Sequence, residues 1–238
     1  MTPCPPPNAH PRLRILSANL WNGNADAERF AQLVVELRVD VAAVQELAPK
    51  QADALARVLP HGCLEPRLDF NGMGIAAPWP LAVRHLALPT RDARVTDLSL
   101  LQVDGTPLSL ELINLHVKAP HSPLGLHTLR RRRDQWRGLH RHIIAAPQRA
   151  RILVGDFNAT PLWPFYRRVA AHLRDAALIA ARQHGRAVQR TWGPRPDGPR
   201  LLRIDHAFVH RVAVLDFQVV DVPGSDHRAV VVDVAAES

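Results

Sequence analysis

Apolar and polar positions follow clear periods in the first part of the sequence. Leu13–Asn19 alternates in the manner of a strand, and the apolar positions within Phe30–Leu37 repeat at the spacing of one helix face. The continuous apolar run Val41–Val44 then ends abruptly in polar residues, of which Glu46 is the last. This order of strand, helix and strand is the usual beginning of an α/β layer architecture.

The middle of the chain combines this pattern with a hairpin. A second helix is expected from Pro49, because proline is tolerated in the first turn of a helix, and Met73–Ala77 is expected to be a short strand. Val95–Val103 and Leu108–Val117 are strand-like runs on either side of an Asp-Gly dipeptide, which favours a tight hairpin turn. Antiparallel pairing within a βα sequence predicts a mixed sheet.

The second half of the chain is expected to contain two helices and four strands. Leu126–Ile144 reads as a helix with Leu129, Trp136, Leu139 and Ile143 facing inward and the arginines facing outward. Gly185–Pro199 is rich in glycine and proline and is expected to be a loop. The remaining predictions are a strand at Arg151–Val154, a helix at Pro164–Leu173, and strands at Leu201–Val209, Val214–Val220 and Ala229–Val234.

Composition sets the expected domain organisation. Residues 1–11 are rich in proline and are expected to form a flexible arm, and residues 12–238 a single domain, since neither a linker nor a repeat is visible. Without an apolar run of about 18 residues, no membrane span is expected. A cytoplasmic monomer is the default expectation, although an N-terminally trimmed parent would leave a secreted or membrane-tethered protein open.

Charge adds an expectation about partners. The chain has 30 Lys and Arg against 22 Asp and Glu, a formal net charge of +8 carried almost wholly by arginine. Such an excess suits a polyanion such as nucleic acid or a phospholipid surface, although arginine-rich composition also follows from the base composition of coding DNA. Two cysteines are too few for a disulfide framework or a thiolate metal site.

Candidate chemistry lies where strands end, because strand after strand finishes in a polar residue for which a sheet core has no use. Side chains at such ends can converge from distant parts of an α/β chain. Carboxylates, amides and imidazoles without cysteine form a hard-ligand set that suits Mg²⁺ or Mn²⁺. The residues concerned are Asn19, Glu46, Asn114, His116, Asp156, Asn158, Asp205, Ser225, Asp226 and His227.

The segments that carry these residues resemble one known family. SANLWNGN, VAAVQE, INLHV, VGDFN, RIDHAFV and GSDHRAV occur in this order between about residues 13 and 234 and resemble the endonuclease/exonuclease/phosphatase superfamily, which includes DNase I. The resemblance implies a four-layer α/β/β/α sandwich of two mixed sheets flanked by helices, with one site at the top. It also implies a Mg²⁺ or Mn²⁺ cofactor.

The same resemblance implies roles for individual residues. Asn19, Glu46 and Asp226 correspond to the metal site, with Glu46 the principal ligand. The other correspondences are His116 as a contact to the scissile phosphate, Asp156 as the carboxylate that orients or deprotonates water, Asn158 as the amide on the transition state, Asp205 as the partner of His227, and His227 as general base or phosphate contact. Which of Asp156 and His227 removes the proton stays open.

Looser matches concern Glu65, Asn114 and Ser225. Glu65 corresponds to a glutamate that orients the phosphate-contacting histidine, here His116, while Asn114 and Ser225 are candidate phosphate contacts. The run Arg130–Arg133 is expected to be a solvated helix face, with phosphate binding as the alternative.

These expectations combine into a ranked functional hypothesis. The first is metal-dependent hydrolysis of phosphodiester bonds in nucleic acid, either DNA or RNA. The alternative with the same chemistry is a phosphodiesterase or phosphatase acting on a phospholipid, sphingomyelin or inositol headgroup. A binding module without catalysis is the third reading, and the competent residue at each expected catalytic position argues against it.

Overall fold

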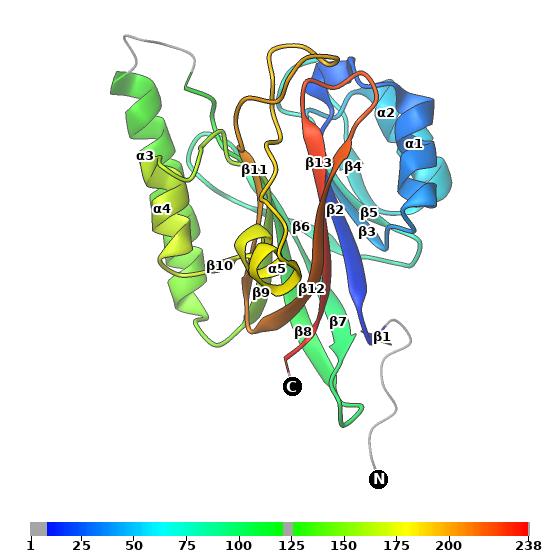
Figure 1. Ribbon diagram of the computed structural model, residues 1–238, viewed down its shortest axis with the longest axis vertical. Helices are drawn as coiled ribbons and strands as arrows, with labels where there is room; N and C mark the ends of the chain where they lie inside the picture. Colours follow the sequence, from blue (N-terminus) through cyan, green and yellow to red (C-terminus); the bar gives the residue numbers. More distant parts are fainter. Residues whose placement is uncertain (1–8, 121–125, 238) are drawn as a thin grey trace.

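Two β-sheets packed face to face form the centre of the molecule, and helices cover their outer faces (Figure 1). The structure is a computed structural model that describes residues 9–120 and 126–237. This arrangement is the expected four-layer sandwich. The predicted arm falls mostly on residues 1–8, outside the described part, whereas Ala9–His10 forms a short strand β1 instead of continuing the arm.

One sheet carries half of the strand ends that concern the site. Its strands lie in the order β1-β7-β8-β9-β11-β10, and β6 pairs with β7. β8 and β9 run parallel to each other, and β11 runs antiparallel to β9. The bounds are β6 Val83–Leu86, β7 Ala93–Leu101, β8 Pro107–His116, β9 Ala150–Asp156, β10 Arg174–Asp175 and β11 Asp205–His210.

The other sheet carries the remaining strand ends. Its order is β12-β13-β2-β3-β5-β4, with β2 parallel to β3 and β13 antiparallel to β2. Both sheets are therefore mixed, as the hairpin pattern predicted. The bounds are β2 Leu13–Asn19, β3 Val41–Gln45, β4 His61–Glu65, β5 Met73–Ala77, β12 Val212–Asp221 and β13 Arg228–Ala236.

The helices divide between the two outer faces. A short 3-10 turn at Trp21–Gly23 precedes α1, and Asp26 begins α1 by accepting a hydrogen bond from the Arg29 backbone N–H. α1 and α2 cover the second sheet, whereas α3 and α4 cover the first (Figure 1). The bounds are α1 Ala27–Glu36, α2 Pro49–Val58, α3 Leu126–Ala145, α4 Pro164–Ala170 and α5 Ala176–His184.

Three apolar cores correspond to the three interfaces between four layers. The central one joins side chains of both sheets, such as Ile15 and Ile152, which are fully buried. The second core packs the inner faces of α1 and α2, including Phe30, onto the second sheet. The third packs Trp136 of α3 and Phe165 of α4 onto the first sheet. Burial of this apolar surface provides the main driving force for the sandwich.

Several predicted elements differ from the observed ones. Leu129 of α3 is 62% exposed instead of facing inward, and Arg132 is buried at 6% exposure instead of lying on a solvated face. The strand predicted at Leu201–Val209 begins only at Asp205, since the preceding residues form a loop that bridges to Trp192. None of the described helices is long and apolar enough to span a lipid bilayer.

Candidate active site

The strand directions bring the predicted residues to one end of the sandwich, the upper end in Figure 1. β2 and β3 are parallel, as are β8 and β9, so the side chains at or just after their carboxyl ends lie at common edges. β11 and β13 run the opposite way and contribute residues from their amino ends. The residues supplied are Asn19, Glu46, His116, Asp156, Asp205 and His227.

Four of these side chains, together with those of Asn158 and Asp226, line one pocket with a volume of about 370 Å³, which we call the strand-end pocket. Charged groups of both signs line it, and Trp21, Phe70 and Trp192 add aromatic surface. Its polar lining residues are Glu46, Arg91, His116, Lys118, Asp156, Asn158, Asp226 and His227. Six of the predicted residues thus share a single cavity.

Asp156 lies at the centre of a network of hydrogen bonds. Its carboxylate accepts bonds from the Asn158 backbone N–H at 2.7 Å, from Asn158 Nδ2 at 2.9 Å and from Asn19 Nδ2 at 3.1 Å. Burial raises its pKa to about 7, with Asp205 and Glu46 adding to the rise and His227 opposing it. A carboxyl group with this pKa can exchange a proton near neutral pH.

The turn that follows Asp156 is built for close approach. Gly155 has φ +138°, and a Cβ there would lie 1.8 Å from the Leu115 carbonyl oxygen, so only glycine fits beside β8. Asn158 adopts the left-handed region with φ +45°, which asparagine tolerates better than most residues. The turn thereby directs two Asn158 donors at the carboxylate of Asp156.

Glu46 also has left-handed backbone geometry, with φ +53° directly after β3. This conformation is costly for glutamate, and such strain is concentrated at functional sites. Burial raises the pKa of Glu46, and nearby Asp226 raises it further, while Asn19 and His227 lower it. Glu46 Oε1 lies 3.6 Å from His116 Nε2, which also lies 3.6 Å from Asp156 Oδ2.

Asp205 and His227 form a buried pair. His227 Nδ1 lies 2.9 Å and 3.1 Å from the two carboxylate oxygens of Asp205, which fixes the ring and leaves Nε2 directed at the pocket side, 3.9 Å from Asp226 Oδ1. Burial alone would lower the pKa of His227, but the carboxylates of Asp205, Asp156 and Asp226 outweigh it and raise the pKa to about 10. Sequence resemblance predicted this pairing, and the two residues are in contact here.

Two groups of side chains could hold a metal ion. Ligand atoms of Asp156, Asp205 and His227 lie within 4.8 Å of one another, but Nδ1 of His227 and both Asp205 oxygens already bond to each other. Glu46 and Asp226 fit a cation better. Asp226 Oδ1 is buried and has no hydrogen-bond partner among the described residues, and burial raises the pKa of both carboxyl groups, so a cation would relieve their proximity.

Three predicted residues have other contacts than expected. Glu65 accepts hydrogen bonds from His85 Nε2 at 2.7 Å and from Arg94, so both oxygens of its carboxylate are engaged away from His116. This corrects the expected orienting role. Glu65 ends the edge strand β4, and its carboxylate meets His85 of β6 and Arg94 of β7.

Asn114 and Ser225 are fully buried, and neither lines the strand-end pocket. Asn114 Nδ2 donates to the carbonyls of Val44 and Gly74, and its Oδ1 accepts from Gln45 Nε2 at 2.7 Å, so its amide joins the two sheets. Ser225 Oγ donates to the Asn19 carbonyl at 2.8 Å and accepts from the His227 backbone N–H. Ser225 therefore ties the ends of β2 and β13 together beneath the site.

Some residues of the site had little or no signal in the sequence. Trp192 Nε1 donates to Asp226 Oδ2 at 2.9 Å, and Thr191 Oγ1 accepts from the backbone N–H of Asp205 at 3.1 Å. Arg91 lines the pocket, and its Nη1 is buried without a hydrogen-bond partner in the described part of the chain. The sequence indicated only that Thr191 and Trp192 lie in the loop predicted at Gly185–Pro199.

Comparison with solved structures gives the same fold. A family protein from Bacteroides vulgatus is 19% identical with a TM-score of 0.69, and the match covers 95% of this chain and 99% of that one. The human Nocturnin catalytic domain with bound sulfate is 18% identical with a TM-score of 0.64, covering 97% and 96%. A mannosyl-6-phosphatase from Bacteroides thetaiotaomicron is 17% identical with a TM-score of 0.65, covering 94% and 99%.

Sequence comparison identifies the family. No curated protein matches the chain significantly. The model of the Endonuclease/Exonuclease/phosphatase family matches residues 16–227, which include all the strand ends described above. The chain therefore belongs to the Endonuclease/Exonuclease/phosphatase family of hydrolases that act on phosphoester bonds.

Proposed function

We propose that this protein is a metal-dependent phosphodiesterase that cleaves nucleic acid. The observation that carries the proposal is the convergence of Asp156, the Asp205–His227 pair, Glu46 and Asp226 on the strand-end pocket. Water would attack phosphorus opposite the leaving oxygen, forming one P–O bond while the other breaks. A proton must leave the water, and the leaving oxygen must gain one.

Asp156 is the residue we assign to the attacking water. Its carboxylate is buried at the floor of the pocket, and the donors of Asn158 and Asn19 hold it in one orientation. His227, oriented by Asp205, is assigned to a phosphate oxygen and is positioned to donate a proton there. His116 and Asn158 line the same pocket; His116 would donate a hydrogen bond to the charge that develops on phosphorus oxygens, whereas both Asn158 Nδ2 hydrogens already bond to the Val117 carbonyl and to Asp156 and hold that carboxylate.

Glu46 and Asp226 are the residues that would hold Mg²⁺ or Mn²⁺, with Asn19 beside them. When bound, such an ion neutralises charge on the phosphate and on the leaving oxygen. The two carboxylates are hard oxygen ligands, and one oxygen of Asp226 is buried without a partner in the described residues. The ordinary cost of burying two like charges gives a reason for a cation at this position.

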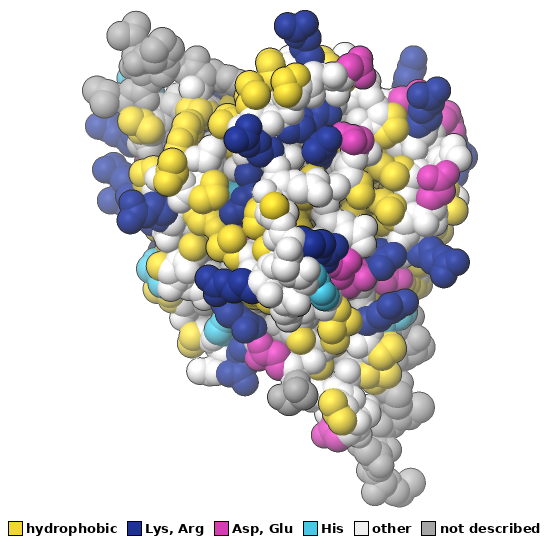
Figure 2. Space-filling view, in the orientation of Figure 1, with side chains coloured by type: hydrophobic (Ala, Val, Ile, Leu, Met, Phe, Trp, Pro, Cys, Tyr) yellow, Lys and Arg dark blue, Asp and Glu magenta, His cyan; other side chains and the backbone are white. Residues whose placement is uncertain are grey.

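The choice of nucleic acid over other phosphodiesters rests on charge. The net charge is +8, and Figure 2 shows Lys and Arg over much of one face, including the side formed by α3 and α4. Arg91 and Lys118 bring positive charge to the strand-end pocket itself. A repeating polyanion uses both the local and the distributed charge, whereas a free inositol phosphate uses only the local charge.

A substrate panel tests the proposal. Plasmid DNA, single-stranded DNA, RNA, sphingomyelin and 4-nitrophenyl phosphate are incubated with the wild-type protein and the Asp156→Asn variant in Mg²⁺ or Mn²⁺. We expect cleavage of nucleic acid by the wild type only. Turnover of the lipid alone would assign the site to headgroups, and turnover of the nitrophenyl monoester alone would make the protein a phosphatase like its mannosyl-6-phosphatase neighbour.

The metal assignment has a test that needs no turnover. Mg²⁺ or Mn²⁺ at about 100 times its dissociation constant should raise the Tm of the EDTA-treated wild type by about 5 °C, because an ion that binds only the folded state stabilises it by about 2.7 kcal/mol. Glu46→Gln and Asp226→Asn should abolish most of this shift. Equal shifts in the wild type and both variants would place the ion elsewhere.

A further inference from the structure

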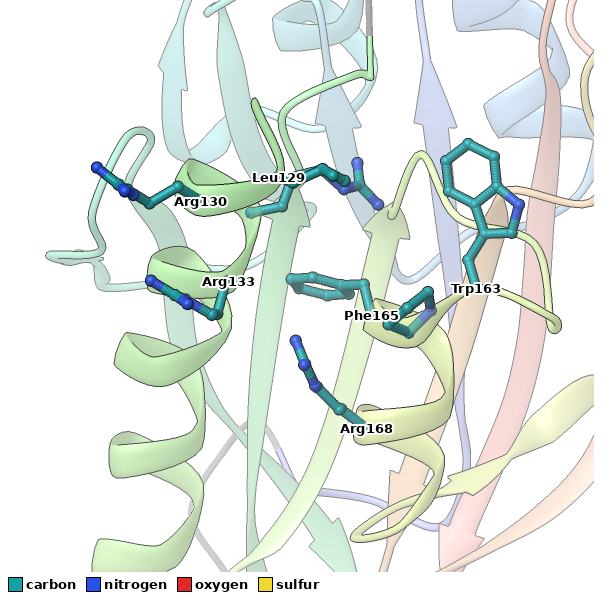
Figure 3. A pocket seen from close by; sticks show the side chains of 8 residues that line it. Leu129, Arg130, Arg133, Trp163, Phe165 and Arg168 are labelled. Atoms are coloured by element: carbon teal, nitrogen blue, oxygen red, sulfur yellow. The ribbon is translucent and has the colours of Figure 1, made fainter. Parts of the chain in front are cut away.

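A second pocket, between α3 and α4, has a composition suited to an anion. Its volume is about 440 Å³, and Figure 3 shows Arg130 and Arg133 projecting from α3 and Arg168 rising from α4 toward Phe165. Buried Arg132 and the rings of Trp163 and Phe165 complete the lining. We call this cavity the arginine pocket; of its four arginines, Arg132 places its guanidinium over the rings of Trp163 and Phe165.

The positive charge of the arginine pocket is not neutralised within the protein. Arg130, Arg132 and Arg168 form no ion pair with a carboxylate in the described residues. Arg133 makes only a long, exposed contact of 3.8 Å with neighbouring Asp134. Four like charges around one cavity repel one another, and an anion bound there would remove the repulsion. Arginine also matches phosphate better than lysine does.

Arg132 connects this pocket to the turn that follows Asp156. Its Nη2 donates to the carbonyl of Asn158 at 3.1 Å and of Phe157 at 3.3 Å, and its Nη1 donates to the carbonyl of Lys118. Its guanidinium lies 5.8 Å from the ring centroid of Trp163 and 5.7 Å from that of Phe165. Arg132 is therefore a fixed wall between the two pockets, which leaves the other three arginines to bind a ligand.

A smaller cavity of about 200 Å³ shares lining residues with both pockets. It shares Asn158 and Trp192 with the strand-end pocket and Trp163 with the arginine pocket. Its other lining residues are mostly apolar, and Trp163 is 38% exposed. The surface thus offers, in order, a phosphate-cleaving site, a cavity with two tryptophans and a cluster of arginines.

We propose that the arginine pocket binds a second phosphate of a single-stranded nucleic acid whose scissile phosphate lies in the strand-end pocket. An intervening base stacks on Trp163, as bases do on exposed aromatic side chains in single-strand binding proteins. This inference rests on the proposed function. On the protein, a phosphate site, an aromatic surface and a second phosphate site follow one another. This order matches the phosphate, base and phosphate of a polynucleotide, whereas a lipid headgroup offers one phosphate attached to long apolar chains.

Two matched triple variants test the proposal. Arg130→Ala, Arg133→Ala and Arg168→Ala together empty the arginine pocket of its exposed charges. Arg131→Ala, Arg167→Ala and Arg182→Ala remove the same net charge from exposed positions on α3, α4 and α5 that do not line it. Binding of a fluorescent DNA single strand of about 12 nucleotides is measured by anisotropy in EDTA, so that no turnover is required.

The expected outcome is a difference between the two variants. The pocket variant should bind the strand at least about tenfold more weakly than the control variant, and Trp163→Ala should weaken binding about tenfold for a normal strand but little for an abasic one. Equal affinities of the two triple variants would overturn the proposal. So would loss of binding to phosphatidylserine vesicles by the pocket variant alone with DNA binding unchanged, which would make the pocket a membrane contact.

Failure of the proposed function has a separate signature. Hydrolysis of bis(4-nitrophenyl) phosphate by the wild type reports the strand-end pocket alone, because this small diester has one phosphate and no nucleobase. If the wild type cleaves no diester but the pocket variant still binds DNA more weakly than the control, the function fails and the binding site stands. If the diester is cleaved and the triple variants bind DNA equally, the function stands and the binding site fails.

Discussion

Asp156 is a residue of the site whose ionised side chain lowers the stability of the fold. Asp156 is 1% exposed, and its raised pKa, about 7, means that the folded protein disfavours the ionised carboxyl group. Burial is the main cause, and the neighbouring carboxylates of Asp205 and Glu46 add to it. The chain has an ionisable group at a position where an apolar or amide side chain would be easier to bury. Such a conflict marks a functional residue.

Asp156→Asn should therefore separate activity from stability. The amide has the same shape but cannot accept a proton, so we expect kcat on a phosphodiester to fall by about 100- to 10,000-fold. In metal-free protein at pH 8, where the wild-type carboxyl group is ionised, the Tm of the variant should be higher by a few degrees, because a buried charge is removed. Steady-state kinetics and thermal denaturation measure the two effects.

Asp53→Asn is the matched control for this substitution, since Asp53 is exposed on α2. It should change neither kcat nor Tm noticeably. A Tm of Asp156→Asn well below that of the wild type would show that the carboxylate stabilises the fold, contrary to the cause assigned to its raised pKa.

Asp205 has the opposite relation to stability. Its two oxygens accept from His227 Nδ1, and Thr191 holds its backbone N–H, so it is a positioning residue for the imidazole. Asp205→Asn should lower kcat by about 100-fold or more through loss of ring orientation, and it should also lower the Tm because a buried ion pair is broken. If kcat falls while the histidine side-chain NMR signals keep their wild-type pH dependence, orientation through His227 is not the cause.

At the scale of elements, the sequence predicts those whose faces differ in polarity. β2 alternates, β3 and most of β9 are apolar runs ended by polar residues, and α3 repeats its buried positions, including Trp136 and Leu139, at helical spacing. By contrast α5 was missed. Its buried face consists of Ala176, Ala177 and Ala180, so the contrast between its faces is small. β10 was also missed, because a strand of two residues is too short to show a period.

The candidate site followed from residue order more than from periodicity. The pocket side chains of β8, β9 and β13 were predicted because each interrupts an apolar pattern at a strand end. The wrong predictions concern polar residues that are buried outside the pocket and bond within the protein. Asn114 and His116 are two positions apart on one strand and both read as polar strand-end residues, but only His116 lines the pocket. Which side chain is satisfied by backbone carbonyls depends on the partner sheet, and a single sequence does not contain that information.

A buried ionic cluster fastens α3 to the first sheet at the end away from the site. Glu111 of β8 is fully buried and contacts Arg151 of β9 at 2.5 Å and His142 of α3 at 3.0 Å. Burial opposes its ionisation, but the bonds from His142 and Arg151 prevail and lower its pKa to about 2. Because the folded-state pKa lies below the ordinary value, the stabilisation is present above about pH 4.5 and is lost as pH falls toward 2.

Glu111→Gln should consequently destabilise the protein at neutral pH and less so in acid. We expect a loss of about 3 kcal/mol in the free energy of unfolding at pH 7, because Arg151 is left buried without its counter-charge. The difference from the wild type should shrink between about pH 4.5 and 2, where Glu111 itself becomes protonated. Urea denaturation across this range measures it, and a difference that stays constant with pH would contradict the ionic origin.

At the scale of the whole molecule, the groups assigned to chemistry and most of the positive charge lie in different places. The strand ends hold the acidic and imidazole groups in one pocket, while most of the positive charge is carried by arginines on helices and loops (Figure 2). Local carboxylates around Asp156 repel a phosphate, and the surrounding arginines attract it. The two effects differ in range, so they respond differently to salt.

Salt should therefore weaken capture of nucleic acid much more than it alters the chemistry. If the arginine pocket and the residues Arg91 and Lys118 supply about four phosphate contacts, the logarithm of the association constant for a single strand should fall with a slope of about −3 against the logarithm of salt concentration. That slope corresponds to about a 60-fold loss of affinity between about 50 and 200 mM salt. Over the same range kcat on bis(4-nitrophenyl) phosphate should change less than about twofold, because the buried pairs of the strand-end pocket are poorly screened. A slope near zero, measured by anisotropy titration, would mean that the net charge of +8 takes no part in binding, and base stacking alone would then have to hold the strand.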